Sequence, residues 1–246
     1  MAKTPGTELP DISVVVPVFD EEGAAPALAR EIAAAFAGRD FEAIFVDDAS
    51  RDGTRAALRA LAGEIPQLRV LSHRRNAGQS RAVRTGVLAA RAPVVVTLDG
   101  DGQNDPADGP GLVDALAAGP SELAMVGGQR VKRQDSQAKK LASRIGNGVR
   151  KRLLNDTADD TGCGLKAFRR DAFLRLPYFD HIHRYLPALM LREGYRVEFR
   201  PVHHRHRQSG RSKYTNLGRL WASLSDLFGV MWLQSRARTP GGVDEG

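Results

Sequence analysis

Short β-branched runs alternate with alanine-rich stretches through the first half of this 246-residue chain, and this alternation constrains the fold most. The runs predict strands at residues 12–18, 41–46, 68–72, 94–98 and 123–127. The stretches between them predict helices at residues 24–37, 54–62, 79–90 and 111–118. Repeated strand–helix–strand units indicate an α/β fold, Rossmann-like, with a mostly parallel sheet and helices on both faces.

Acidic residues follow three of the expected strands, at positions 20–22, 47–48 and 99–101. Ligands of such sheets bind beyond the carboxyl ends of the strands, so we expect these acids at one edge. Asp99 and Asp101, with Gln103 after them, form the most informative group. Two carboxylates one residue apart can hold Mg²⁺ or Mn²⁺ and connect it to substrate phosphates. The alternative for this group is a solvated turn after a strand.

The second acidic group leads from a strand into a helix. Ser50 or Asp52 can cap that helix, and Gly53 permits a tight turn. Capping does not explain why two acids, Asp47 and Asp48, stand side by side at the end of an apolar strand. A carboxylate at this position can accept hydrogen bonds from a base or a ribose. The chain contains no Walker lysine motif and no G-x-G-x-x-G, so P-loop and dinucleotide-fold interpretations have no support.

The charge balance favours an anionic partner. The formal charge is +7 and the isoelectric point is near 9.9, which suits a phosphorylated substrate, an anionic membrane face or nucleic acid. Nucleic acid is disfavoured, because no RRM, KH or helix-turn-helix signature appears. The single cysteine, Cys163, excludes an internal disulfide. With no apolar leader and no apolar run of about 18–20 residues, a cytoplasmic, soluble or peripheral protein is expected.

A series of ordered motifs resembles the GT-A glycosyltransferases of family 2. They lie at residues 15–22, 46–54, 76–78, 99–103, 160–170 and 207–214. Within that family, the chain is most similar to the polyprenyl-phosphate sugar transferases of the dolichol-phosphate mannosyltransferase type. The resemblance covers roughly residues 11–236. Two departures are the pair Gly164-Leu165, where the family often has one aromatic residue, and the missing transmembrane tail.

This resemblance implies a role for each matching residue. The nucleotide would contact Pro17, Phe19, Glu21, Asp47, Asp48 and Asp99. Mg²⁺ or Mn²⁺ would be held by Asp99, Asp101 and Gln103. The acceptor phosphate would be bound by Arg130, Arg133, Ser212 and Lys213. The implied catalytic set is Asp99, Asp101, Asp160, Arg207 and Lys213, in which Asp160 orients the acceptor or acts as a base.

The implied enzyme is inverting and metal-dependent. It would move a sugar from a UDP- or GDP-sugar to a polyprenyl phosphate at the cytoplasmic face of the membrane. The alternatives are a soluble or saccharide acceptor and, less favoured, a basic nucleic-acid-binding protein. The expected organisation is a disordered tail at 1–10, a GT-A catalytic domain at 11–207, a lid loop and amphipathic helix at 208–238, and a tail at 239–246.

Two segments suggest peripheral membrane contact. Residues 137–155 combine apolar residues at four-residue spacing with the basic residues Lys139, Lys140, Arg144, Arg150, Lys151 and Arg152. Residues 217–234 form an apolar face with Leu217, Leu220, Trp221, Leu224, Leu227, Phe228, Met231 and Trp232. The alternative for both segments is ordinary packing on the core or against a second copy in a homo-oligomer.

Overall fold

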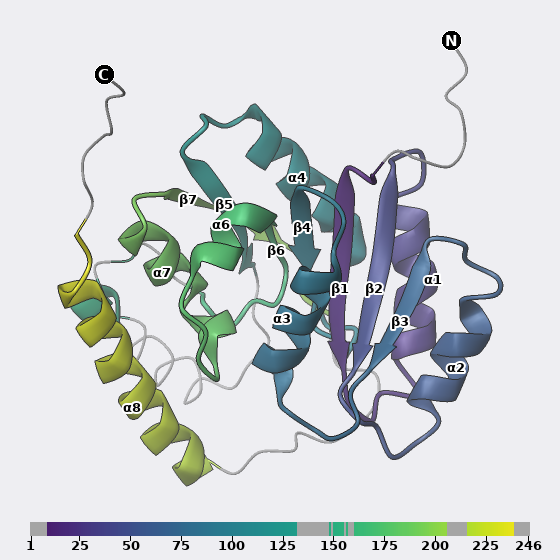
Figure 1. Cartoon of the computed structure of the whole chain (residues 1–246). Helices are drawn as coiled ribbons and strands as arrows, with labels where there is room; N and C mark the ends of the chain where they lie inside the picture. The colour runs from purple at the N-terminus through teal and green to yellow at the C-terminus, as the bar shows by residue number, and fades with distance from the viewer. Residues whose placement is uncertain are drawn as a thin grey trace, which may run out of the picture.

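The computed structural model describes residues 9–131, 148, 150–154, 156, 160–205 and 216–238, and of residues 216–223 it describes the backbone only. One seven-stranded sheet forms the centre of this part of the chain, in the order β3-β2-β1-β4-β6-β5-β7 (Figure 1). Its strands are β1 Ile12–Val18, β2 Phe41–Asp47, β3 Leu68–Ser72, β4 Val94–Thr97, β5 Leu123–Arg130, β6 Lys166–Arg169 and β7 Arg196–Val202.

The sheet is mostly parallel. β1 lies between β2 and β4 and is parallel to both, and β3 extends this parallel half. β6 is the exception, because it runs antiparallel to both β4 and β5, while β7 is parallel to β5. The expected α/β class and mostly parallel sheet are therefore confirmed, and β6 is an antiparallel insertion that the sequence pattern did not predict.

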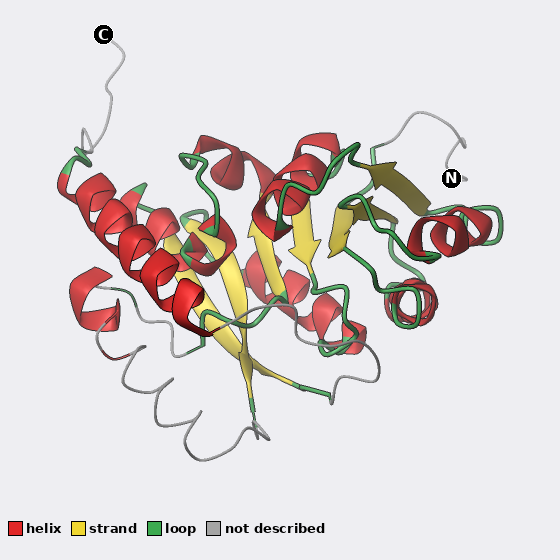
Figure 2. Ribbon diagram, turned by 90° about the horizontal axis from the view of Figure 1, so that it is seen from below, coloured by secondary structure: helices red, strands yellow, loops and turns green. Residues whose placement is uncertain are grey.

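Helices cover both faces of the sheet (Figure 2). The first face is packed by α1 Ala25–Ala35, α2 Thr54–Leu61 and α4 Gly109–Ala118. The second face is packed by α3 Gln79–Ala89, α6 Arg170–Arg175, α7 Leu186–Arg192 and α8 Asn216–Ser235. Two 3₁₀ turns, η1 Pro106–Asp108 and η2 Ile182–Arg184, precede α4 and α7.

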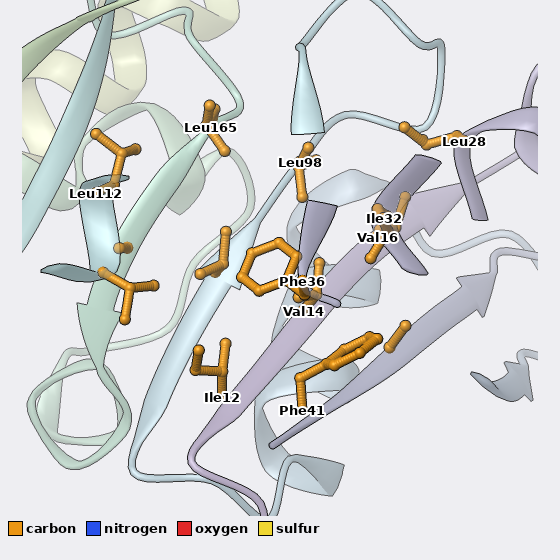
Figure 3. Packing of buried hydrophobic residues seen from close by; sticks show 14 of the residues in the cluster. Ile12, Val14, Val16, Leu28, Ile32, Phe36, Phe41, Leu98, Leu112 and Leu165 are labelled. Atoms are coloured by element: carbon orange, nitrogen blue, oxygen red, sulfur yellow. The ribbon is translucent and has the colours of Figure 1, made fainter. Parts of the chain in front are cut away.

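Alternation along the buried strands divides the core into two clusters. Val14 and Val16 of β1 face α1, whereas Val15 faces α3. In the first cluster the rings of Phe36 and Phe41 lie 5.7 Å apart, among the buried side chains of β1 and α1 (Figure 3). Full burial of a large apolar side chain such as Phe36 contributes roughly 1.5–3 kcal/mol, so the sheet is held firmly enough to fix the loops at its edge.

The loops at the carboxyl ends of β1, β2 and β4 converge because these three strands are parallel neighbours. The pairing of β1 with β4 ends at Val15, opposite Thr97. Pro17 therefore fits within β1, because its missing N–H removes no hydrogen bond on that side of the strand. Gly100 then passes close to Pro17: a β-carbon at residue 100 would lie 2.5 Å from the Pro17 carbonyl oxygen. Only glycine permits this approach, and it brings the turn after β4 against β1.

Candidate active site

Hydrogen bonds join the loop after β1 to the loop after β2. The Asp20 amide donates to Ser50 Oγ at 2.9 Å, and the Glu21 amide donates to Thr54 Oγ1 at 2.8 Å. In return, the Arg51 amide donates to Asp20 Oδ1 at 2.7 Å. Glu21 is buried beneath this junction. The polar residues of the second acidic segment thus fix the position of the loop that the resemblance assigns to the nucleotide.

Asp47 and Asp48 are both buried at the end of β2, but they have different partners. Asp47 accepts hydrogen bonds from the Ser50 amide at 3.0 Å and from Arg55 Nε at 2.7 Å. Arg55 is partly exposed, so the buried Asp47 carboxylate is connected to the surface through this ion pair.

The Asp48 carboxylate is engaged by other groups of this protein. It accepts from the amides of Ala77 and Gly78 at 2.9 and 2.7 Å, and it contacts His73 Nδ1 at 2.7 Å. Gly78 has φ +87°, a left-handed conformation that favours glycine, and α3 begins directly after it. Asp48 therefore fixes the loop that positions the N-terminus of α3. We expect this residue to support the nucleotide site through that loop.

The turn after β4 carries the proposed metal ligands. The Asp99 amide donates to Asn104 Oδ1 at 3.1 Å, and Asp101 Oδ1 accepts from the Gln103 amide at 3.1 Å. Gly102, at φ +72°, completes the turn. The Arg205 amide donates to the Gln103 carbonyl at 2.9 Å, so the segment after β7 anchors this turn from the other side.

Asp99 is the most perturbed carboxylate of the turn. Burial and the neighbouring Asp101 raise the pKa of Asp99 to about 6, while Lys166 and Arg130 oppose that rise. Gln79, at the start of α3, donates to Asp99 Oδ1 at 2.7 Å. A divalent cation would offset the repulsion between the two acids, so the turn fits the oxygen-ligand chemistry of Mg²⁺ or Mn²⁺. The described residues contain no group of three or more His, Cys, Asp or Glu side chains placed to hold a metal, so the remaining ligands would come from substrate or water.

The acceptor-side candidates Arg130 and Asp160 form one ion pair. Arg130 Nε and Nη2 donate to the two oxygens of Asp160 at 2.6 and 2.8 Å. This fork geometry is the strongest form of such a pair. Burial alone would lower the pKa of Arg130, but the hydrogen bonds and the charge of Asp160 outweigh burial, and the pKa is raised. The sequence suggested each residue separately, and their separation of 30 positions gave no sign that they pair.

Three residues that the sequence did not single out also reach this site. Lys166 lies in β6 directly opposite Thr97, and its ammonium donates to the Cys163 carbonyl. His183 contacts Ser80 Oγ through Nδ1 at 2.7 Å. Together with Gln79, they line a cavity beside Asp99. No local motif marked these residues, because β6, η2 and α3 meet only through the tertiary fold.

Several expected site residues lie outside the described part of the chain: Arg133, Arg207, Ser212 and Lys213. The two expected tails and most of the first basic segment also lie outside it. Within that segment Arg150 is buried and paired with Asp156 at 2.5 Å. The expectation that Arg150 displays its charge to a membrane is therefore wrong, because an internal carboxylate binds it.

Helix α8 matches the expected amphipathic helix closely. Leu227 and Val230 pack into the second core cluster, and Gln234 Nε2 donates to the Leu154 carbonyl at 2.9 Å. On the other side Phe228 and Trp232 are 63% and 59% exposed, four residues apart. No helix in the described residues has the length and apolarity needed to cross a membrane. Within the described residues, the helix thus has one face on the core and exposes an apolar stripe on the other.

Comparison with known proteins identifies the family. The model of the family described as "Glycosyl transferase family 2" matches residues 13–176, a span that contains the turn at Asp99 and both acidic loops. The chain belongs to glycosyl transferase family 2. A dodecaprenyl-phosphate galacturonate synthase of Rhizobium johnstonii is 33% identical over 94% of this chain and 69% of its own length.

The chain is also similar to a second lipid-sugar transferase and to a solved structure. An undecaprenyl-phosphate 4-deoxy-4-formamido-L-arabinose transferase of Aeromonas hydrophila is 35% identical over 85% of this chain but 64% of its own length. The present chain thus spans about two thirds of these relatives. Glucosyl-3-phosphoglycerate synthase of Mycobacterium tuberculosis, solved with Mn²⁺, UDP-glucose and phosphoglyceric acid, shares the fold at a TM-score of 0.67 and 20% identity, over 94% of this chain and 82% of that one.

Proposed function

We propose that this family 2 enzyme transfers a sugar from a nucleoside diphosphate to a polyprenyl phosphate, with inversion at the sugar carbon. The observation that carries the proposal is the similarity, over 94% of the chain, to a relative named for dodecaprenyl-phosphate galacturonate synthesis. The acidic turn at Asp99 and Asp101, placed beside the loops after β1 and β2, supports the donor side of the reaction.

The donor nucleotide would lie across the carboxyl ends of β1 and β2. Pro17, Phe19 and Glu21 would form its wall, and Asp47 would accept a hydrogen bond from the base or ribose. Asp48 would act by fixing the loop that leads into α3, given its contacts with Ala77 and Gly78.

The leaving group is the nucleoside diphosphate, and its developing charge must be neutralised. A Mg²⁺ or Mn²⁺ ion held by Asp99, Asp101 and Gln103 would supply that charge. The Asn104 and Gln103 hydrogen bonds keep the turn in place before substrate arrives, so little reorganisation is needed. Gln79 would hold the Asp99 carboxylate in its orientation.

The acceptor phosphate is already an anion at neutral pH, so it needs positioning and charge screening more than a strong base. Arg130, held by Asp160, would present a fixed positive charge on the acceptor side. Arg133, Arg207, Ser212 and Lys213 are proposed to complete the phosphate site. Asp160 would then orient Arg130, and through it the acceptor.

The enzyme is proposed to attach peripherally to the cytoplasmic face of the membrane. The exposed stripe of Leu224, Phe228 and Trp232 on α8 would enter the interface, where tryptophan is favoured. Lys151, Arg152, Arg236 and Arg238 would add attraction to anionic lipids. The phosphate of a polyprenyl acceptor lies at the same depth, so this attachment would bring the site to its substrate.

The test is a donor panel assayed for a lipid-linked product. UDP- and GDP-sugars are offered with a short polyprenyl phosphate and Mg²⁺ or Mn²⁺, and the lipid fraction is analysed by mass spectrometry. We expect a product with one donor class, loss of it in EDTA, and a fall of at least about 10²-fold in turnover for Asp101→Asn. Full activity in EDTA would contradict the metal assignment, and transfer only to soluble phosphorylated acceptors would contradict the lipid.

A further inference from the structure

The ammonium of Lys166 is buried without a carboxylate in contact. Lys166 is 4% exposed, and its Nζ donates to the carbonyl of Cys163. No Asp or Glu among the described residues lies within the 4.0 Å that defines an ion pair with it. An ammonium carries three donors, so this contact uses one of them. The other two need an acceptor from outside the described chain.

Burying an ammonium that no carboxylate contacts costs free energy. Buried charges are normally paired or fully hydrogen-bonded, because transfer from water into the protein removes their hydration. Burial accordingly lowers the pKa of Lys166, while Asp99 and Asp160 oppose that effect from a distance. Such a residue is seldom retained for stability alone, so its location points to a ligand.

The location is the cavity beside Asp99. Val83 and Leu186 form part of its apolar wall, and the polar side chains of Gln79, Asp99, Lys166 and His183 also line it. Gln79 already donates a hydrogen bond to Asp99. Burial, together with the nearby charges of Arg184 and Lys166, holds the pKa of His183 well below its usual value, so its ring is neutral at pH 7. Lys166 is therefore the cation among the described residues that line this cavity.

Arg130, a second cation that acts on the charge of Asp99, is not equivalent. Both arms of its guanidinium that face Asp160 are occupied by that carboxylate. An anion entering the cavity would thus find at Lys166 a charge that no carboxylate contacts, whereas the charge of Arg130 is compensated by Asp160 and only its remaining N–H groups are available. Apolar walls around Lys166 would strengthen the contact, because the local dielectric is low.

We propose that Lys166 is a substrate-binding residue that contacts an anionic oxygen group in the cavity beside Asp99. This inference rests on the proposed function, and it names two possible sources of the same chemistry. One is a carboxylate on the sugar of the donor, which would make the enzyme select a uronic acid. The other is the phosphate of the polyprenyl acceptor.

Calorimetry separates the two sources. The parent and Lys166→Gln are first titrated with UDP or GDP alone, in the presence of Mn²⁺. They are then titrated with two donors that differ only in the carboxylate. The pair is UDP-galacturonate and UDP-galactose, or GDP-mannuronate and GDP-mannose. A third titration uses a short polyprenyl phosphate in detergent. Arg59→Gln is the matched control, because Arg59 is exposed on α2. Thermal melting shows whether each variant is folded.

A uronate preference of at least about tenfold in the parent, lost in Lys166→Gln, would assign the donor carboxylate. A loss of about tenfold or more in polyprenyl phosphate affinity, with no donor preference, would assign the acceptor phosphate. If Lys166→Gln bound the donors and the polyprenyl phosphate as tightly as the parent does, the inference would be overturned. Nucleotide binding by the parent would still leave the proposed function standing. If Lys166→Gln did not fold, a parent that preferred neither the uronate donor over its neutral partner nor polyprenyl phosphate over polyprenol would overturn it. A parent that bound no nucleotide would overturn the proposed function and this inference together.

Discussion

The Asp99 carboxylate lies directly against the α-carbon of Gly164: a β-carbon at residue 164 would stand 2.3 Å from the Asp99 carboxyl carbon. Thr97 fixes this approach, because its hydroxyl donates to the Gly164 carbonyl at 2.8 Å. Gly164 belongs to the pair Gly164-Leu165, which stands where the family often has one aromatic residue. A glycine at this position has a physical reason here, since Asp99 occupies the space that a side chain would need. The acceptor-side loop and the proposed metal turn share this contact.

Gly164→Ala should displace Asp99 and reduce turnover by at least about tenfold, because a shift of the carboxylate by even 1 Å disturbs the ligand geometry. The fold should survive, since the Asp99 side chain can move aside. Steady-state kinetics and thermal melting measure the two effects. Gly111→Ala in α4 is the control, as nothing lies within 4 Å of its β-carbon position. Equal activity of Gly164→Ala and the parent would show that the contact is unimportant.

Asp99→Asn should stabilise the metal-free protein at alkaline pH. The pKa of Asp99 is about 6 in the folded protein against 3.8 in the unfolded chain, so the folded state binds this proton more tightly. The resulting destabilisation is absent below the unfolded pKa and complete above the folded one. We expect a gain of about 1–2 kcal/mol at pH 8, allowing for partial exposure. Urea unfolding in EDTA at pH 8 and pH 5 checks it, and a gain that does not shrink at pH 5 would contradict the assignment.

Asp48→Ala should destabilise the protein more than Asp47→Ala does. The first change leaves the amides of Ala77 and Gly78 without their acceptor and should cost about 2–4 kcal/mol. The second leaves the Arg55 guanidinium and one amide, that of Ser50, without their acceptor. Both residues are partly exposed to water, so about 1 kcal/mol is expected. Urea unfolding measures both. Calorimetry with UDP and GDP tests the base contact, and unaltered binding by Asp47→Ala would reduce Asp47 to a structural role.

The exposed stripe of α8 should bind anionic liposomes. Phe228→Ser with Trp232→Ser should release most of the protein in a flotation assay, because two exposed aromatic rings leave the interface. Salt should weaken the binding of the parent without abolishing it. Ser225→Ala, also exposed on α8, is the control. Flotation of the double variant at the level of the parent would favour a contact between copies of this chain.

The parallel half of the fold was predictable because its elements carry strong local signals. β1 and β3 have the expected bounds, and α3 ends at Ala89, one residue before the expected end. β6 was missed because it is four residues long and contains two charged side chains, one of which is the buried Lys166. β7 was missed for a similar reason, since the charged residues along Arg196–Val202 hide its pairing with β5.

The candidate site was predictable only where it follows strand ends. Asp48, Asp99 and Asp101 were expected at one edge, and the parallel register of β1, β2 and β4 brings their loops together there. Which acid contacts substrate and which supports a loop depends on hydrogen bonds that no motif encodes, as Asp48 shows. Lys166 and His183 reach the cavity through an antiparallel strand and a 3₁₀ turn, and neither placement has a sequence signal.

The number of phosphates in the lipid product tests the central claim most directly. Attack by the acceptor phosphate on the sugar carbon expels a nucleoside diphosphate and leaves the lipid with one phosphate. Mass spectrometry of the purified lipid should therefore give the mass of the polyprenyl phosphate plus one sugar residue. A lipid-linked sugar diphosphate would mean that a sugar phosphate is transferred and a nucleoside monophosphate is released, and that result would contradict the account.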